Sequence, residues 1–282
     1  MTTFAITGVT GHFGQTAIKT LAKLVPAEQI VALARNTEKA AAIVPAGVQV
    51  RPGDYTDVDE LTASLAGVDR LLLISSQPGA KVTREQQHKN VVDAAKAAGV
   101  DYIAYTSFPH ADTAKAPLAA DHKATEDYIK AAGIKHSFLR NNWYLENEAG
   151  SLKAAAAGKP FVYSAAEGKT GWALEREYAE AAADVLAATD TKDVYEFSGK
   201  ARTYKELADA TPGDFKVLSI DDDAFKQGLL KAGLDEGTAG FITGFQAFIR
   251  AGVLDEDSND LPTVLGRELT PIKDAVKEVL GE

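Results

Sequence analysis

Residues 7–14, Thr7-Gly8-Val9-Thr10-Gly11-His12-Phe13-Gly14, decide the fold class. The apolar run Phe4-Ala5-Ile6 precedes this stretch, and an amphipathic helical pattern follows it. Gly8 permits a tight turn, Gly11 lets the backbone approach a diphosphate, and Gly14 lets the helix pack closely on the strand. The start of the helix offers N–H groups and a positive dipole end to phosphates. This order of strand, glycine turn and helix predicts a dinucleotide-binding unit.

The first half of the chain alternates short apolar runs with amphipathic helical stretches. Strands are predicted at 3–7, 30–34, 48–51, 70–74, 102–105 and 136–139, and helices at 13–24, 37–43, 58–66, 84–98 and 119–132. Strands that are apolar throughout and separated by helices predict a parallel sheet covered on both faces. Residues 1–140 are therefore expected to form a doubly wound α/β domain, the Rossmann fold.

The pattern changes after Asn141. Helices are predicted at 151–157, 175–188, 204–210 and from 223 onward, and strands at 161–163, 194–197 and 215–219. We therefore expect residues 141–282 to form a smaller α+β lobe packed against the first domain, with an approximate boundary and segments free to interleave. Phe241, Phe245 and Phe248 share one helix face, and burial statistics favour packing on the core over contact with a substrate.

Composition excludes several classes of protein. The 30 basic and 40 acidic residues give a net charge of −10, which disfavours nucleic acid and anionic lipid as partners. The chain has no cysteine, which excludes disulfides and thiolate metal sites, and its five histidines lack the spacing of a metal site. No signal peptide or membrane-spanning run stands out, so we expect a soluble cytoplasmic protein with no metal.

Arg35 follows the second predicted strand, about twenty residues after the last glycine of the turn. An acidic residue at this place holds the ribose of NAD, whereas an arginine suits the 2′-phosphate of NADP. The alternative is an ordinary surface arginine at a strand end. Asp54 and Tyr55 follow the third strand and Ser75-Ser76-Gln77 the fourth, at the edge where open α/β sheets bind ligands. We expect them near the adenine and the ribose, with a plain loop role as the alternative.

The sequence lacks the proton-transfer pair of the usual short-chain dehydrogenases, Tyr-x-x-x-Lys. None of the nine tyrosines has a lysine four residues later. In that pair the lysine lowers the pKa of the tyrosine so that it can transfer a proton to a carbonyl. Chemistry of that type, including sugar epimerisation, is therefore disfavoured.

The sequence resembles the NmrA-like atypical short-chain reductases, and within them the bacterial type-2 NAD(P)H:quinone oxidoreductases. The matching stretches lie throughout the nucleotide-binding half, and the C-terminal third matches more loosely. They are Ala5-Ile6-Thr7-Gly8, Thr10-Gly11, Arg35-Asn36, Leu72-Leu73-Ile74-Ser75-Ser76, Ala94-Ala95-Lys96-Ala97-Ala98-Gly99-Val100, Ile103-Ala104-Tyr105-Thr106-Ser107, His110-Ala111-Asp112, Arg140-Asn141, Trp143-Tyr144 and Glu146-Asn147.

The resemblance implies two-electron reduction of a small-molecule quinone by NADPH, without flavin. It places the nicotinamide near residues 106–108 and the loop 141–144. The expected cofactor-binding residues are Gly8, Thr10, Gly11, His12, Phe13, Gly14, Arg35, Asp54, Tyr55, Ser75, Ser76, Gln77, Thr106, Ser107, Phe108, Asn142, Trp143 and Tyr144. The expected catalytic residues are His122, Asn142 and Tyr144. The oligomeric state stays open, with a homodimer as one option.

His122 stands where several isoflavone-reductase-like relatives carry a catalytic lysine, eleven residues before the glycine that ends the helix, here Gly133. This departure disfavours a lysine-type proton mechanism. An imidazole titrates near neutral pH and can donate a proton, but a histidine that only lines the cleft is an equal alternative, and His110 is similarly ambiguous. At the level of function, the alternatives are a non-catalytic NADP(H)-sensing regulator and a reductase of another planar acceptor.

Overall fold

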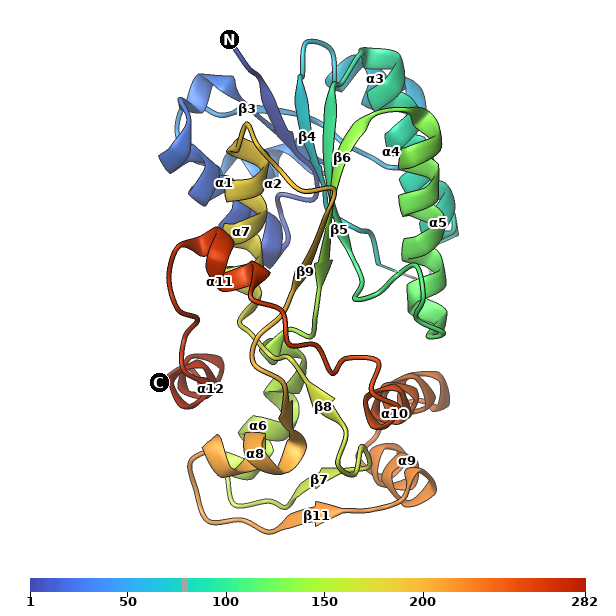
Figure 1. The fold of residues 1–282 in the computed structure, drawn as a ribbon, viewed down its shortest axis with the longest axis vertical. Helices are drawn as coiled ribbons and strands as arrows, with labels where there is room; N and C mark the ends of the chain where they lie inside the picture. The colour runs from blue at the N-terminus through green and yellow to red at the C-terminus, as the bar shows by residue number, and fades with distance from the viewer. Residues whose placement is uncertain (78–80) are drawn as a thin grey trace. The chain divides into compact units, whose positions relative to one another are not determined.

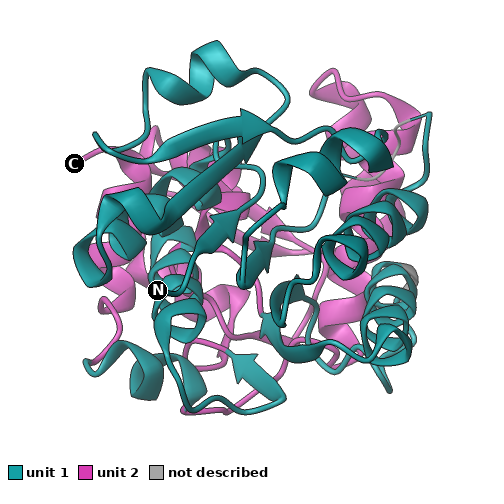
Figure 2. Cartoon of the chain, turned by 90° about the horizontal axis from the view of Figure 1, so that it is seen from above, with its two compact units in different colours: residues 1–141, 175–197, 260–267 teal, residues 142–174, 198–259, 268–282 magenta. Residues whose placement is uncertain are grey.

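The computed structural model describes residues 1–77 and 81–282, which divide into two compact units. Unit 1 contains residues 1–141, 175–197 and 260–267, and unit 2 contains residues 142–174, 198–259 and 268–282 (Figure 2). The chain leaves unit 1 after Asn141, next to the boundary expected from the sequence, and returns to it twice.

A seven-stranded parallel sheet forms the centre of unit 1 (Figure 1). Its strands, in spatial order, are β3 (Gln49–Pro52), β2 (Ile30–Ala34), β1 (Phe4–Ile6), β4 (Arg70–Leu73), β5 (Tyr102–Ser107), β6 (Lys135–Asn141) and β9 (Val194–Phe197). The strand order reverses between β1 and β4, where a doubly wound sheet opens a ligand crevice at its carboxyl edge. The sheet confirms the predicted Rossmann fold.

Helices cover both faces of this sheet. Helices α1 (His12–Leu24) and α7 (Glu175–Ala187) pack together on one face, and α3 (Val58–Ser64), α4 (Arg84–Ala98) and α5 (Pro117–Ala132) pack on the other (Figure 1). The short α2 (Thr37–Ala41) and η1 (Ala27–Gln29) flank β2, and α11 (Asp260–Leu265) packs on α7 and β9. Gly99 and Gly133 end α4 and α5 in the left-handed conformation, which glycine adopts without a steric cost.

The strands of unit 1 are apolar because both faces of the sheet are covered. All residues of β1, β2 and β5 are buried. Fully buried Leu33, Leu71, Ile103 and Phe138 belong to the core on the side of α3, α4 and α5. Burying each such side chain stabilises the fold by roughly 1.5–3 kcal/mol. The sheet is therefore a rigid platform for the loops at its carboxyl edge.

Unit 2 has mixed secondary structure, as expected. Its strands pair as β7 (Phe161–Tyr163) with β11 (Val217–Ser219), in parallel, and as β8 (Lys169–Thr170) with β10 (Arg202–Thr203), antiparallel. Its helical segments are η2 (Leu145–Glu148), α6 (Ala149–Ala156), α8 (Tyr204–Ala210), α9 (Asp222–Lys231), α10 (Glu236–Arg250) and α12 (Ile272–Leu280). Phe245 of α10 is buried as predicted, but Phe241 on the same stripe is 55% exposed, so only part of the stripe packs on a core.

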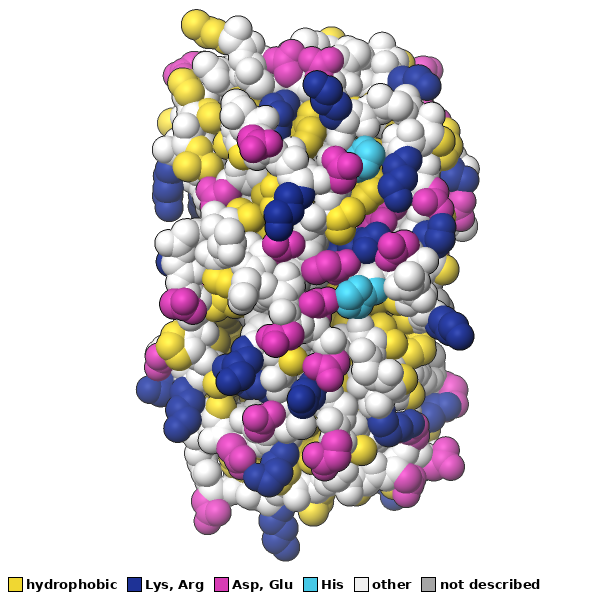
Figure 3. All heavy atoms as spheres, in the orientation of Figure 1, with side chains coloured by type: hydrophobic (Ala, Val, Ile, Leu, Met, Phe, Trp, Pro, Cys, Tyr) yellow, Lys and Arg dark blue, Asp and Glu magenta, His cyan; other side chains and the backbone are white. Residues whose placement is uncertain are grey.

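Acidic and basic side chains intermix over the face drawn in Figure 3. Among the described residues, no helix combines the length and the hydropathy that crossing a bilayer requires.

Candidate active site

The glycine turn has the geometry that its sequence predicts. Gly8 has a φ of +62°, a conformation that side chains with a Cβ rarely adopt. A Cβ on Gly14 would lie 2.4 Å from the Gly8 carbonyl oxygen and 2.7 Å from Cα of Val9. The Gly11 N–H donates to the Gly8 carbonyl at 3.0 Å, which closes the turn. The turn thus brings the start of α1 against β1 with no side chain between them.

Helix α1 begins in a way that suits an anion. Its N-cap is Gly11, which supplies no side-chain cap, and its first turn has no acidic residue. The carboxylate of Glu175, the first residue of α7, accepts a hydrogen bond from the Phe13 amide. Burial raises the pKa of Glu175, while His12 and the Phe13 amide oppose that rise. The start of α1 thus already binds one anionic group, the Glu175 carboxylate. This is consistent with the affinity for phosphate that the glycine turn predicts.

Arg35 and Tyr55 lie near each other at the carboxyl edge of the sheet. Arg35 directly follows β2 and is exposed, so its guanidinium is accessible to a ligand. The Tyr55 hydroxyl points inward, donating to Thr7 Oγ1 at 2.5 Å or to the Ile74 carbonyl at 2.8 Å. Burial raises the pKa of Tyr55, and the nearby Arg35 charge opposes that rise. Tyr55 thus ties the ends of β1 and β4 together beside Arg35.

The loop after β4 carries Ser75 and Ser76, both half-buried, and is held by three side chains from two elements, β5 and α4. The Ser75 N–H donates to Thr106 Oγ1 on β5 at 2.9 Å. The Ser76 N–H donates to His88 Nε2 at 2.9 Å, and Arg84 Nε donates to the Ser76 carbonyl at 2.5 Å. Arg84 and His88 lie four residues apart on α4 and fix both backbone polar groups of Ser76. Gln77, in the same loop, is exposed.

His88, Tyr105, His122 and Thr125 form a buried group that we call the histidine cluster. His122 Nδ1 lies 2.8 Å from the Tyr105 hydroxyl, and His88 Nδ1 lies 2.9 Å from Thr125 Oγ1. Burial and the positive charge of Arg84 lower the pKa of His88 to about 3 and the pKa of His122 well below its usual range. Both imidazoles are therefore neutral at physiological pH.

The hydrogen-bond partners fix the tautomer of His122. Arg84 is a donor only, so His122 Nε2, 3.3 Å from Arg84 NH1, accepts, and its proton must be on Nδ1, facing Tyr105. The Phe108 ring stacks on the His122 imidazole, with 6.1 Å between ring centroids. A neutral His122 whose only proton is directed at Tyr105 is a poor proton donor toward any ligand.

A second group, the arginine cluster, consists of buried Ser107, Glu126 and Arg140 together with half-buried Glu196 and exposed Asp112. Arg140 donates two bonds to Glu126, at 2.8 and 2.9 Å, and one each to Asp112 and Glu196. Burial alone would lower the pKa of Arg140, but the carboxylates of Glu126 and Glu196 raise it above its usual value. Ser107 donates to Glu126 at 2.6 Å. These bonds fix the end of β5 to α5, β6 and β9.

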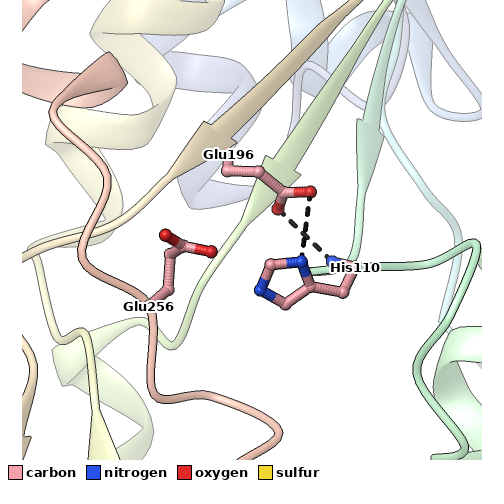
Figure 4. A group of neighbouring side chains, drawn as sticks. All are labelled: His110, Glu196 and Glu256. Carbon is pink, nitrogen blue, oxygen red and sulfur yellow. Dashed lines mark hydrogen bonds and ion pairs between the residues drawn. The ribbon is translucent and has the colours of Figure 1, made fainter.

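His110 lies at the edge of the arginine cluster with a φ of +48°, unusual for a residue other than glycine. Its imidazole is turned toward Glu196, with 3.6 Å between Nδ1 and the carboxylate (Figure 4). The His110 N–H donates to the same carboxylate at 3.3 Å. Glu196 thus holds the loop that follows β5.

Asn142, Trp143 and Tyr144 directly follow β6 and belong to unit 2. Asn142 is buried, and its side-chain amide donates to the Leu254 carbonyl or the Ser198 hydroxyl. The Trp143 indole N–H donates to the buried Glu148 carboxylate at 3.1 Å. The Tyr144 backbone pairs with Ala173 in an isolated β-bridge. The assignment of these three residues to a ligand stays a prediction.

The structure brings the unit 1 residues predicted from the sequence to one edge of the sheet. The glycine turn, Arg35, Tyr55, Ser75, Ser76 and residues 106–108 all lie at or just beyond carboxyl ends of the parallel strands. Sequence reasoning missed Arg84, His88 and Glu126. The missed signal is polar spacing on helices: Arg84 and His88 are four residues apart, as are His122 and Glu126, so each pair shares one helix face.

Comparisons with known proteins identify the family of this chain. A family model described as NAD(P)H-binding matches residues 8–168. Quinone oxidoreductase 2 of Escherichia coli (strain K12) is 40% identical over 283 residues, which cover 98% of each chain. The crystal structure of an NADPH-dependent quinone oxidoreductase from Escherichia coli, complexed with NADPH, matches with a TM-score of 0.92 at 38% identity, covering 98% of this chain and 99% of that one.

Triphenylmethane reductase from Citrobacter sp., complexed with NADP(H), is also similar, with a TM-score of 0.91 at 34% identity over 98% of this chain and 99% of that one. Both structures share the complete fold and not only the nucleotide-binding half. The chain therefore belongs to the NAD(P)H-binding, NmrA-like family of reductases that includes quinone oxidoreductase 2 of Escherichia coli.

Proposed function

We propose that this protein is an NADPH-dependent oxidoreductase that transfers a hydride to quinones without flavin. The observation that carries the proposal is the full-length identity of 40% to quinone oxidoreductase 2 of Escherichia coli. The edge of the sheet in unit 1 supports it with a glycine turn, an accessible Arg35 and a loop held rigidly at Ser75 and Ser76.

The residues of this edge fit a dinucleotide phosphate. The Gly14 position has no room for a Cβ, so α1 packs closely on the turn, and Gly11 has no side chain to keep a diphosphate from the start of α1. In this proposal Arg35 pairs with the 2′-phosphate, the Ser75 region lies near the ribose, and residues 106–108 lie near the nicotinamide. When bound, NADPH supplies a hydride from C4 of its nicotinamide.

Hydride transfer to a quinone does not require a general acid or base from the protein. A quinone is a strong hydride acceptor, and its reduction leaves a hydroquinone anion, which water can protonate. The protein therefore has mainly to position two rings and exclude competing reactions. Neutral histidines and the lack of a Tyr-x-x-x-Lys pair are consistent with a protein that positions the two rings while water supplies the proton.

Titration of NADPH and NADH against the wild type and Arg35→Ala tests the cofactor assignment. Charge-assisted hydrogen bonds to a phosphate contribute about 1.5–3 kcal/mol, or about ten- to a hundredfold in affinity. We expect Arg35→Ala to lose that factor for NADPH and to bind NADH as the wild type does. Equal losses for both cofactors would mean that Arg35 has a structural role or binds another phosphate.

We further propose that the protein carries neither flavin nor a catalytic metal. The absence of cysteine, the lack of paired histidine ligands in the sequence and the single dinucleotide turn support this. We expect a colourless preparation whose activity survives a chelator. Flavin absorbance that copurifies with activity would contradict direct transfer, and loss of activity with the chelator would contradict a metal-free reaction.

Similarity to triphenylmethane reductase supports a second candidate acceptor, a triphenylmethane dye. Competition between a benzoquinone and such a dye for one enzyme, at fixed NADPH, separates the two. We expect a larger kcat/KM for the quinone. A non-catalytic NADP(H) sensor, the other alternative, would bind NADPH and turn over neither acceptor.

A further inference from the structure

One aromatic ring of α10 is left in solvent. Phe241 is 55% exposed, the highest value for a large hydrophobic side chain among the described residues of unit 2. Phe245, one turn further along α10, is buried, and its ring meets the Phe241 ring edge to face with 4.8 Å between centroids. Phe241 is therefore held against a fixed ring while most of its own surface stays uncovered.

Trp143 contacts the same buried ring, with 4.4 Å between the centroids of Trp143 and Phe245. Trp143 is half-buried, and its only polar side-chain atom is already engaged, because the indole N–H donates to Glu148 at 3.1 Å. The Glu148 carboxylate also accepts from the Tyr204 hydroxyl at 2.8 Å, which fixes it in turn. Any part of the indole that solvent reaches is thus apolar. We call Trp143, Phe241 and Phe245 the aromatic platform.

A glycine leaves the helix surface beside Phe241 open. Gly244 lies three residues after Phe241, on the same face of α10. Beyond its chain neighbours and the backbone of its own helix, a Cβ on Gly244 would meet no atom within 4 Å. Packing therefore does not require glycine there, although glycine inside a helix is less stable than alanine. A residue that breaks a local rule without a packing reason is expected at a functional site.

The size and the chemistry of this surface favour a small planar molecule over a protein. At 55% exposure Phe241 offers roughly 100 Å², whereas each partner of a stable protein interface buries about 800 Å². Val217 and Leu218, the other exposed large hydrophobic side chains described in unit 2, belong to β11. Aromatic rings pair with other rings in offset or edge-to-face stacks. Trp143 also comes two residues after Asn141, the end of β6, and so directly follows the carboxyl edge of the sheet.

We propose that the aromatic platform binds the hydride acceptor and selects quinones that have two or more fused rings. This specificity rests on the proposed function. The second ring of a naphthoquinone stacks on Phe241 and on the accessible part of Trp143, in the space that Gly244 leaves open. A benzoquinone has no second ring and gains less from the platform. The platform transfers neither electrons nor protons and acts through binding alone.

Calorimetric titration of the NADP+-loaded protein measures this selection without turnover, with 2-methyl-1,4-naphthoquinone and 1,4-benzoquinone as the probes. We expect Phe241→Ala to weaken naphthoquinone binding about three- to tenfold, as the loss of one aromatic pair predicts, and benzoquinone binding less. Phe241→Tyr keeps the ring and should bind both probes as the wild type does. Leu218→Ala is the matched control, because it removes an exposed apolar side chain from another element and should change neither affinity.

Gly244→Leu tests the open space from the opposite direction. Leucine is the better helix former, so we expect this variant to be at least as stable as the wild type. Its side chain fills the space beside Phe241, so we expect it to lose more naphthoquinone affinity than Phe241→Ala does. Gly228→Leu, on α9, is the control, since a Cβ on Gly228 also meets nothing within 4 Å. Thermal unfolding and NADPH titration of each variant check the fold and the cofactor site.

Turnover gives the second readout. In Phe241→Ala the ratio of kcat/KM for the naphthoquinone to that for the benzoquinone should fall about three- to tenfold, mainly through KM. The proposal is overturned if Phe241→Ala and Gly244→Leu bind the naphthoquinone like the wild type, or if Leu218→Ala loses as much. It is also overturned if Phe241→Ala turns a dimer into a monomer, because the platform would then be a subunit interface. A wild type that oxidises no NADPH with either quinone removes the proposed function itself, whereas an unchanged ratio in an active Phe241→Ala removes only this specificity.

Discussion

The histidine cluster and the arginine cluster share two elements, α5 and β5, but differ in whether their buried ionisable groups are charged. Helix α5 supplies His122 and Thr125 to the first and Glu126 to the second, and β5 supplies Tyr105 to the first and Ser107 to the second. Burial makes the two histidines neutral, whereas three carboxylates keep Arg140 charged.

The difference shows that burial alone does not decide whether a group is charged. An ion taken out of water stays charged only when an opposite charge and hydrogen bonds replace its hydration. Arg140 has both, through its bidentate contact with Glu126. His88 has neutral partners and a nearby cation, Arg84, so its neutral form is favoured. Removing one partner from the arginine cluster should therefore destabilise the fold, whereas the two histidines of the histidine cluster do not titrate near neutral pH.

The largest effect is expected for Arg140→Met. This change leaves Glu126, whose side chain is 1% exposed, as a buried charge without a cation. Breaking a buried pair in this way destabilises a protein by about 3–5 kcal/mol. Urea unfolding should show a loss of that size. The double variant Arg140→Met/Glu126→Gln should recover most of it, because the unpaired charge is gone, and equal losses in the single and double variants would contradict the charged cluster.

A smaller effect is expected on acidification, from the histidine cluster. The folded pKa of His88 is lowered to about 3 from an ordinary 6.5, so its contribution to stability is complete above pH 6.5 and is lost as the pH falls toward 3. Between pH 7 and pH 5 this costs roughly 2 kcal/mol of unfolding free energy. The His88→Gln variant lacks this titrating group. Between pH 7 and pH 5 its unfolding free energy should therefore fall by roughly 2 kcal/mol less than that of the wild type. An unchanged pH dependence in His88→Gln would mean that His88 is not held neutral.

The smallest effect is expected on the rate of quinone reduction by His122→Ala. A positioned general acid contributes about 10²–10⁴-fold, and a neutral imidazole whose Nδ1 proton is directed at Tyr105 should contribute far less. We expect kcat to fall by less than about tenfold. Steady-state kinetics with NADPH and a benzoquinone measure this. A loss beyond about a hundredfold, with NADPH affinity intact, would make His122 the catalytic acid.

The sequence was sufficient to predict the glycine turn after β1, because its geometry depends on the backbone. Gly8 and Gly14 have a conformation or a close approach that other residues cannot adopt, so their spacing alone indicates the turn. The alternation of apolar strands and helices likewise predicted the parallel sheet of unit 1, with element ends within a few residues of those observed.

The two clusters could not be predicted, because their members come from elements far apart in the chain. Glu196 of β9 contacts Arg140 of β6, 56 residues away, only after the chain has returned to unit 1. Arg84 contacts His122 across 38 residues. The strands β8 and β10 contain two residues each and show no periodicity that a sequence pattern could reveal. Tertiary pairing, rather than local propensity, determines such features.

The most direct test of the central claim is the anaerobic reaction of the purified, flavin-free protein with NADPH and a benzoquinone. The loss of NADPH absorbance and the formation of hydroquinone are followed together. We predict that one hydroquinone forms for each NADPH oxidised, much faster than in the absence of protein, with a primary kinetic isotope effect when C4 of NADPH carries deuterium. NADPH binding with no oxidation above the protein-free rate, or oxidation only after flavin is added, would contradict direct hydride transfer to the quinone.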